Sequence, residues 1–490
     1  MTKHGKIKKL YCRCFSTGYI VCLTLFLLMS SAGLSFSNEN GEFRITGYIQ
    51  HRSEFGLADA EYNPDGYTMA EFLMNMELNY EYSEKLIFHQ IIRARYDGIY
   101  DWRNYFEDQS QAEDELKNEL EIRELYLDYA PIEDLNFRIG KQTVIWGETD
   151  GLRLMDLINP QDLRWGYVTR AFEDTRTPLS MVRVNYSIPF LEDNQGGFEL
   201  IWVPTEFEVN KYPIDGSAYA MAPADFFNEQ IQDILAAGFL PTVTNEKREQ
   251  DKDNGQFGTK FTGNIFGMDF SLNYLYSYSH DPVIYFDGRE MGGVLPPGFV
   301  GTFNMAQRYP RRHTGGLTFS KAFGRVVLRG EFAYTFDNQF QNLTEVNWVE
   351  ESDYLKGMLG FDWVYANTGF NNGRSIFISG QFFNNHIMDY NDNIVNLPYG
   401  YSMKEDEQIA TLLINTGFLS DDLKPEIFVA YDISYKSWWI NPKLGIQYGS
   451  LWRFEVGANF FEGESGDTQH VPFAMMDQGD SAYVQVRRMF

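Results

Sequence analysis

Charged side chains stand at alternate positions of several segments, where they could line a pore. In residues 71–82, Glu71, Glu77 and Glu81 share one face, and mostly aromatic or aliphatic side chains alternate with them. The same alternation assigns to the polar face Arg93, Arg95, Asp97, Glu124, Arg138, Arg183, Arg329, Glu331, Arg453, Glu455 and Arg487. Rings of charged groups set the ion selectivity of pores. Alternatively, opposite charges on neighbouring strands neutralise one another and stiffen the wall.

The segment 146–178 holds a second concentration of charge, and it is unusually apolar for a connection between strands. Its charged residues that could face a pore are Glu148, Arg153, Asp156, Asp162, Arg164, Arg170 and Arg176. If the flanking strands close into a barrel, we expect this segment to fold back into its lumen and constrict it. The alternative is an outer loop that only caps such a barrel. Glu148 either pairs with a nearby arginine or touches solute.

Two structural positions stand out in the same segment. Asn159-Pro160 is a typical turn initiator. Trp146 and Gly147 come directly after a predicted strand. Trp146 fits either an aromatic girdle or an anchor for the inserted loop, and the sequence does not separate the two.

Enzymatic, metal and nucleic-acid chemistry have little support. The histidines after residue 37 are scattered through different segments, which disfavours a Ser/His or Asp/His catalytic group at the barrel rim. No zinc spacing or phosphate-binding loop is present. The formal net charge is −27, so nucleic acid is repelled. We therefore expect no enzyme activity, no metal, no cofactor and no nucleic-acid partner, while the acidic excess weakly favours cations in a pore.

Residues 1–37 have the three-part plan of a secretory signal peptide. Basic residues come first, an apolar run extends from Tyr19 to Met29, and Ser35 and Ser37 precede a plausible cleavage site. Cleavage would remove five basic residues and no acidic ones, so the net charge would become −32. It would also remove Cys12, Cys14 and Cys22, the cysteines of the sequence.

The remaining 38–490 read as short strands with period-2 alternation. No later apolar run approaches the length of a membrane helix, and a membrane protein without such helices must be a closed barrel. The expected strands lie near 43–55, 69–83, 86–97, 119–130, 135–145, 179–190, 197–203, 256–266, 268–279, 312–321, 324–336, 354–366, 375–384, 407–419, 425–434, 438–448, 451–461 and 481–490. The fold class is therefore all-β: a transmembrane antiparallel up-and-down barrel of about 18 strands, with 16 as the alternative.

The connections between these strands support the same architecture. Short links such as Phe266-Gly267 and Gly449-Ser450 alternate with mostly long ones such as 204–255 and 280–311. Short periplasmic turns and long outer loops are typical of outer-membrane barrels. Within 204–255, the stripe beginning at Asp225 predicts a helix, which either packs on its own barrel or forms a lid or apolar patch.

One motif resembles a known family. Gly140-Lys141-Gln142, Trp146-Gly147-Glu148 and Asn159-Pro160-Gln161-Asp162 are similar to the signature of a large family of Gram-negative outer-membrane proteins of undefined function. The resemblance implies a porin-like barrel, with some members similar in outline to alginate-export porins. It implies no particular substrate.

These observations together predict a passive porin-like channel or facilitated transporter for small solutes in the outer membrane. The alternatives are a transporter of hydrophobic or polymeric substrate working with periplasmic partners, and a structural barrel. The expected partners are outer-membrane lipid and lipopolysaccharide, and the barrel assembly machinery through the terminal Phe490. A homo-oligomer is left open.

Overall fold

The computed structural model describes residues 34–38, 41–57, 66–102, 110–166, 172–189, 196–214, 217, 219, 225–246, 252–293, 295–366, 369, 371–396, 401–463 and 473–490. The predicted signal peptide therefore lies largely outside the described residues. Its last residues belong to β1 (Leu34–Asn38), which pairs with the start of β2.

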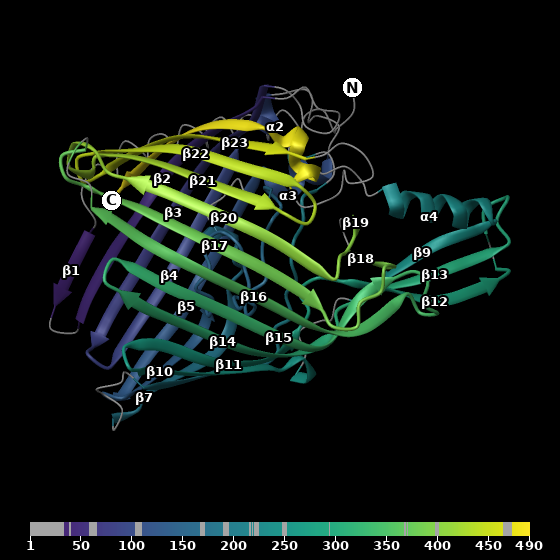
Figure 1. Ribbon diagram of the computed structural model, residues 1–490, viewed down its shortest axis with the longest axis horizontal. Coiled ribbons are helices and arrows are strands. Elements are labelled where there is room, and N and C mark those ends of the chain that lie inside the picture. The colour runs from purple at the N-terminus through teal and green to yellow at the C-terminus, as the bar shows by residue number, and fades with distance from the viewer. Residues whose placement is uncertain are drawn as a thin grey trace, which may run out of the picture.

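Eighteen antiparallel strands form a closed barrel (Figure 1). They are β2 (Gly41–Gly56), β3 (Gly66–Ser83), β4 (Leu86–Asp97), β5 (Asn118–Ile132), β6 (Leu135–Gln142), β7 (Leu179–Ser187), β8 (Gly197–Val203), β10 (Gln256–Ile265), β11 (Met268–Tyr278), β14 (Arg311–Phe323), β15 (Val326–Asn342), β16 (Val349–Ala366), β17 (Ser375–Ile387), β20 (Asp406–Thr416), β21 (Leu423–Asp432), β22 (Ser437–Tyr448), β23 (Trp452–Glu462) and β24 (Ser481–Met489). The last strand pairs with the first, for example Arg487 with Gln50, and this closes the ring. Closure leaves the barrel without a sheet edge. The prediction of 18 strands is confirmed, and the alternative of 16 is wrong.

Alternation along each strand separates two surfaces. Large apolar side chains such as Leu120, Leu272 and Leu359 are exposed on the outside, at 78%, 51% and 54%. Charged side chains such as Glu71 and Glu331 are buried on the inside, at 1% and 0% exposure. An apolar exterior and a charged interior are the reverse of a soluble protein and fit a barrel surrounded by lipid.

One end of the barrel carries the short turns, among them Phe266-Gly267 and Gly449-Ser450, and the opposite end carries the long connections. We call them the short-turn end and the long-loop end. The connection between the expected strands 324–336 and 354–366 is mostly strand, because β15 and β16 continue to pair beyond a bulge between Thr335 and Asn338. The short strands β18 (Ile394–Asn396) and β19 (Tyr401–Ser402) extend the sheet beside them.

A small second sheet stands beyond the long-loop ends of β15 and β16 and projects away from the barrel (Figure 1). It contains β9 (Phe239–Asn245), β12 (Val283–Met291) and β13 (Gly301–Arg308), with β13 in the centre and β9 parallel to it. The predicted helix is present as α4 (Asp225–Ala236). Ile234 of α4 packs on Phe303 and Met305 of this sheet, so the described part of the helix covers the projecting sheet.

Two other helices, α2 (Ile99–Trp102) and α3 (Ser110–Leu116), lie in the connection between β4 and β5. Ala112 and Leu116 of α3 are fully buried in a cluster with Met69 and Trp165. No helix among the described residues is long and apolar enough to span a membrane.

Candidate functional site in the lumen

The described parts of the connection between β6 and β7, residues 143–166 and 172–178, lie inside the barrel, and we call them the inner segment. Its apolar side chains pack on inward-facing residues of β7, β8, β11 and β15–β17. The resulting cluster contains Val144, Trp146, Leu154, Met155 and Ile158 of the inner segment, and Leu179, Met181, Ile201, Val203, Leu275, Ala333, Met358 and Phe383 of the wall. On this side the lumen is an apolar core, because chain and not water covers the inward faces of the strands.

Trp146 anchors the start of the inner segment. It is 1% exposed, and its indole N–H donates to Glu199 Oε1 at 2.6 Å. The other carboxylate oxygen of Glu199 accepts from Arg183 Nε at 2.9 Å. The ring lies over Gly258, where an added Cβ would come within 2.6 Å of it. Of the two roles left open by the sequence, the structure selects the anchor over the girdle.

Glu331, predicted to face the lumen, holds the inner segment through main-chain bonds. Its carboxylate accepts the backbone N–H of Glu148 at 2.6 Å and that of Met155 at 2.5 Å. Gly147 fits closely beside it, since an added Cβ would lie 3.1 Å from Glu331 Oε1. One buried carboxylate thus fixes two points of the segment. The Glu148 side chain itself is exposed.

Arg329 makes a second set of contacts to the same stretch. It donates to the carbonyl of Glu148 at 2.7 Å, to Asp150 at 2.6 Å and to Asp362 at 2.7 Å. Asp150 also accepts from Gln381 Nε2 at 2.9 Å. Arg329 therefore ties the inner segment to three neighbouring strands, and sequence reasoning missed Asp150 and Gln381 because neither belongs to a motif.

Asn159 closes the base of the inner segment, as a turn residue would. It is fully buried; its Oδ1 accepts from Val144 N at 2.9 Å, and its Nδ2 donates to Thr177 O at 2.8 Å. The carbonyl of Pro160 accepts from Thr177 N at 2.7 Å. The two residues join the start of the segment to its end.

Two ion-pair groups stiffen the rest of the segment. Asp156 is held by Arg176 at 2.7 Å and by Arg153 at 3.2 Å. Arg164 contacts Asp162 at 2.7 Å and Glu119 of β5 at 2.8 Å. Burial opposes ionisation of Asp162, but the hydrogen bonds and charge of Arg164 hold the pKa of this carboxyl below its ordinary value. Arg170 lies outside the described residues.

The predicted wall charges are largely paired. Arg93 contacts Asp174 of the inner segment at 2.7 Å, Arg95 contacts Glu71 at 3.0 Å, and Arg138 contacts Asp128 at 2.8 Å. These pairs follow the neutralisation alternative of the sequence analysis. No group of three or more His, Cys, Asp or Glu side chains among the described residues is placed to hold a metal ion.

Two of the cavities lined by described residues flank the inner segment. The larger, of about 700 Å³, lies between the inner segment and β2, β3 and β20–β24; the smaller, of about 310 Å³, lies between the inner segment and β11 and β14–β16. Thr149, Asp150 and Gly151 line the larger cavity. Arg153, Asp156 and Leu157 line the smaller one, and the two cavities share no described lining residue. Adjacent positions of one segment therefore separate them.

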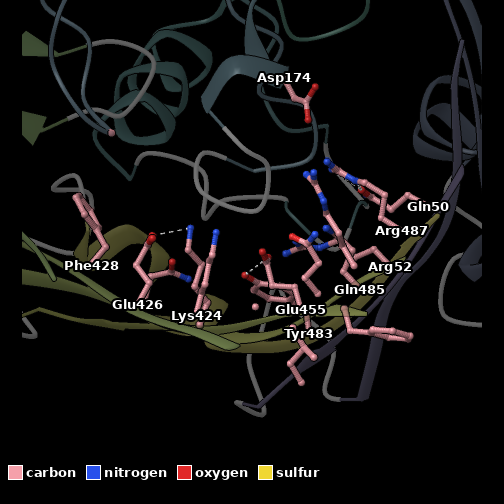
Figure 2. A pocket seen from close by; sticks show the side chains of 18 of the residues that line it. Gln50, Arg52, Asp174, Lys424, Glu426, Phe428, Glu455, Tyr483, Gln485 and Arg487 are labelled. Atoms are coloured by element: carbon pink, nitrogen blue, oxygen red, sulfur yellow. Dashed lines mark hydrogen bonds and ion pairs between the residues drawn. The ribbon is translucent and has the colours of Figure 1, made fainter. Parts of the chain in front are cut away.

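Figure 2 shows the wall of the larger cavity, with side chains of β2, β21, β23 and β24 on one side and Asp174 of the inner segment across from them. Most of its carboxylates have partners: besides those above, Glu426 contacts Lys443 at 2.7 Å, and Glu455 accepts from Tyr483 at 2.9 Å. Lys424 and Arg453 make no ion pair with any described residue, and among the acidic lining residues Asp422 and Glu455 make none either.

A closed 18-stranded barrel whose lumen is divided by its own folded-in connection places the chain in the class of porin-like β-barrels. The chain belongs to the family described as "Protein of unknown function (DUF1302)", which matches residues 57–490. No curated protein matches it.

Several solved barrels are similar in outline. Salmonella typhi OmpF, in a complex with daunomycin, has a TM-score of 0.43 and 11% identity over 93% of this chain and 100% of its own. OccAB3 of Acinetobacter baumannii has a TM-score of 0.48 and 9% identity over 91% of this chain and 99% of its own. OccK5 (OpdH) of Pseudomonas aeruginosa has a TM-score of 0.45 and 9% identity over 91% of this chain and 97% of its own. These values say nothing about the solute.

Proposed function

We propose that this protein is an outer-membrane channel for small polar solutes, with the inner segment as its constriction. The observation that carries the proposal is a charge-lined cavity of about 700 Å³ inside a closed barrel whose outer surface is apolar. Only a closed barrel lets strands cross lipid with every backbone group paired. The predicted signal peptide supports export, and the short-turn end would face the periplasm.

The inner segment supports the constriction because it stands between the two cavities. Solute crossing the barrel through the larger cavity would pass residues 149–151, and solute in the smaller cavity would meet residues 153–157. Glu331 and Arg329 hold this stretch in place. We propose that the width of the channel depends on these contacts.

An apolar path from the helix at Asp225 into the lumen would favour the alternative of a hydrophobic-substrate transporter. The described part of α4 packs on the projecting sheet instead. No specific observation favours that alternative over the polar channel.

The test is single-channel conductance in a planar bilayer, comparing the wild type with Glu331→Ala. We expect small, steady steps from the wild type and clearly larger ones from the variant, because the inner segment loses two charge-assisted hydrogen bonds. Glu455→Gln is the matched control, since Glu455 is a lumenal carboxylate bound by Tyr483 and not by the inner segment. Folded protein that is silent both as wild type and as Glu331→Ala would refute the channel.

A further inference from the structure

The smaller cavity has features of a binding site beyond those of a passage. It lies at the long-loop end, where the inward faces of β11 and β14–β16 meet residues 153–161 of the inner segment. Its volume of about 310 Å³ falls at the lower end of the range for small-molecule sites. Its lining combines amides and hydroxyls with the apolar side chains of Leu157, Val283 and Phe340. A small molecule with a polar and an apolar part would fit it.

Cations outnumber carboxylates in this cavity. Arg153, Arg312 and Lys356 line it together with Asp156 and Asp281. Asp156 is held by Arg153 and by Arg176, which stands behind the lining. The group of four cations and two carboxylates therefore leaves an excess of positive charge.

Two of the cations lack a carboxylate partner. Neither Arg312 nor Lys356 makes an ion pair with any described residue, and Arg312 Nε is buried without a hydrogen-bond acceptor. The Lys356 ammonium lies over the ring of Tyr354, with 5.0 Å between Nζ and the ring centroid. Asp281 is engaged elsewhere, because it accepts hydrogen bonds from Asn210 at 2.5 Å and from Tyr212. Both side chains are half-buried, and a cation withdrawn from water without a partner is costly, so a bound anion would supply the partner that the wall lacks.

His280 also lies near the positive charges of this cavity. Burial and the charges of Arg153 and Arg312 lower its pKa to about 3, against the opposing effect of Asp281. The imidazole is therefore neutral near pH 7, and it adds no charge of its own.

We propose that the smaller cavity binds a small organic or inorganic oxyanion, a carboxylate or a phosphate, between the Arg312 guanidinium and the Lys356 ammonium. The planar fork of an arginine matches two oxygens of either group, and lysine adds a point charge. The inference deepens the proposed channel function by assigning its solute class, because an anion held here lies directly outside the constriction.

The experiment is isothermal titration calorimetry on the purified full-length barrel in detergent at low salt, with succinate and with inorganic phosphate in separate runs. We expect saturable binding of at least one of them. Arg312→Gln and Lys356→Gln should each weaken it by roughly tenfold or more, because each removes a charged hydrogen-bond donor. Arg312→Lys keeps the charge but loses the planar fork of the guanidinium. Its affinity for the anion should therefore lie between those of the wild type and Arg312→Gln. Heat-modifiable gel migration confirms that each variant is a folded barrel.

The matched control is Arg453→Gln, which removes an unpaired lumenal cation from the larger cavity. Binding that survives this change but not the changes at Arg312 and Lys356 supports the site. Succinate alone, phosphate alone or both binding would assign the carboxylate, the phosphate or the shared oxyanion chemistry. Absence of saturable binding by either anion, or equal weakening by Arg453→Gln, overturns the site. A protein that conducts but binds neither anion keeps the channel and loses the site; one that binds but stays silent in the bilayer does the reverse.

Discussion

The two sides of the lumen differ although their strands share the same alternation. From β7 to β17, inward-facing residues at the height of the inner segment include Met181, Ile201 and Met358, which are 1–2% exposed. From β20 through β24 to β3, the inward faces carry residues such as Arg52, Lys424 and Glu455 around an open cavity. The difference teaches that the polarity of an inward face follows what covers it: folded chain selects apolar residues, and water selects charged ones.

The largest expected effect tests the covered side. Trp146→Ala should lower the free energy of unfolding by about 3–5 kcal/mol, because it opens a cavity in the cluster and removes the hydrogen bond to Glu199 Oε1. Urea-induced unfolding in detergent would measure it. Trp202→Ala is the control on the neighbouring face, since Trp202 is 54% exposed on the outside of β8. Equal losses from both variants would contradict the anchoring role.

Glycine substitutions sharpen the comparison at smaller scale. At Gly316 on the covered side, an added Cβ would lie 2.4 Å from Met155 Sδ, whereas at Gly445 beside the open cavity its nearest neighbour would be 3.7 Å away. We expect Gly316→Ala to cost about 1–3 kcal/mol of unfolding free energy through overpacking. Gly445→Ala should be close to neutral. The same urea titration measures both costs. A larger loss of unfolding free energy from Gly445→Ala than from Gly316→Ala would contradict the assignment of β14 to the covered side and β22 to the open side.

Charge reversal on the open side should change selectivity without changing stability. Arg453→Glu is expected to shift the permeability ratio toward cations by roughly two- to fivefold, because a charge a few Å away in water is worth about 1 kcal/mol or less. The reversal potential under a salt gradient measures it. Lys321→Glu, at the edge of a short turn outside both cavities, is the control. An unchanged reversal potential would place the conducting path elsewhere.

The smallest effect concerns pH. Because the folded pKa of Asp162 is lowered below its ordinary 3.8, its ionised form stabilises the fold above that value, and the contribution disappears as pH falls through the lower folded pKa. Asp162→Asn should therefore cost on the order of 1 kcal/mol at pH 7, and progressively less as the pH falls through the lowered folded pKa. Urea titrations at pH 7 and in acid test this. A cost that persists in acid would mean that packing, and not charge, is responsible.

Much of the barrel follows from sequence because alternation is a local signal. The predicted strands all have counterparts, and Asn159 and Glu331 lie where motif and alternation place them. The projecting sheet escaped prediction because β9 and β13 pair in parallel across about sixty residues of sequence, and each alone reads as loop. The apolar side of the lumen was also not predicted, because it depends on a contact between segments far apart in the sequence. A Met358 that faces inward cannot be told from one that faces lipid until the inner segment covers it.

The bonds from Glu331 end on main-chain nitrogens, and this has a consequence for variation among relatives. Any residue except proline offers the same N–H at positions 148 and 155, so the carboxylate places no demand on the side chains there. Position 148, whose side chain is exposed, can thus exchange charge, size or polarity while the tether stays intact, whereas packing in the apolar cluster constrains Met155. A tether of this kind separates where the inner segment lies from which side chain it presents at position 148.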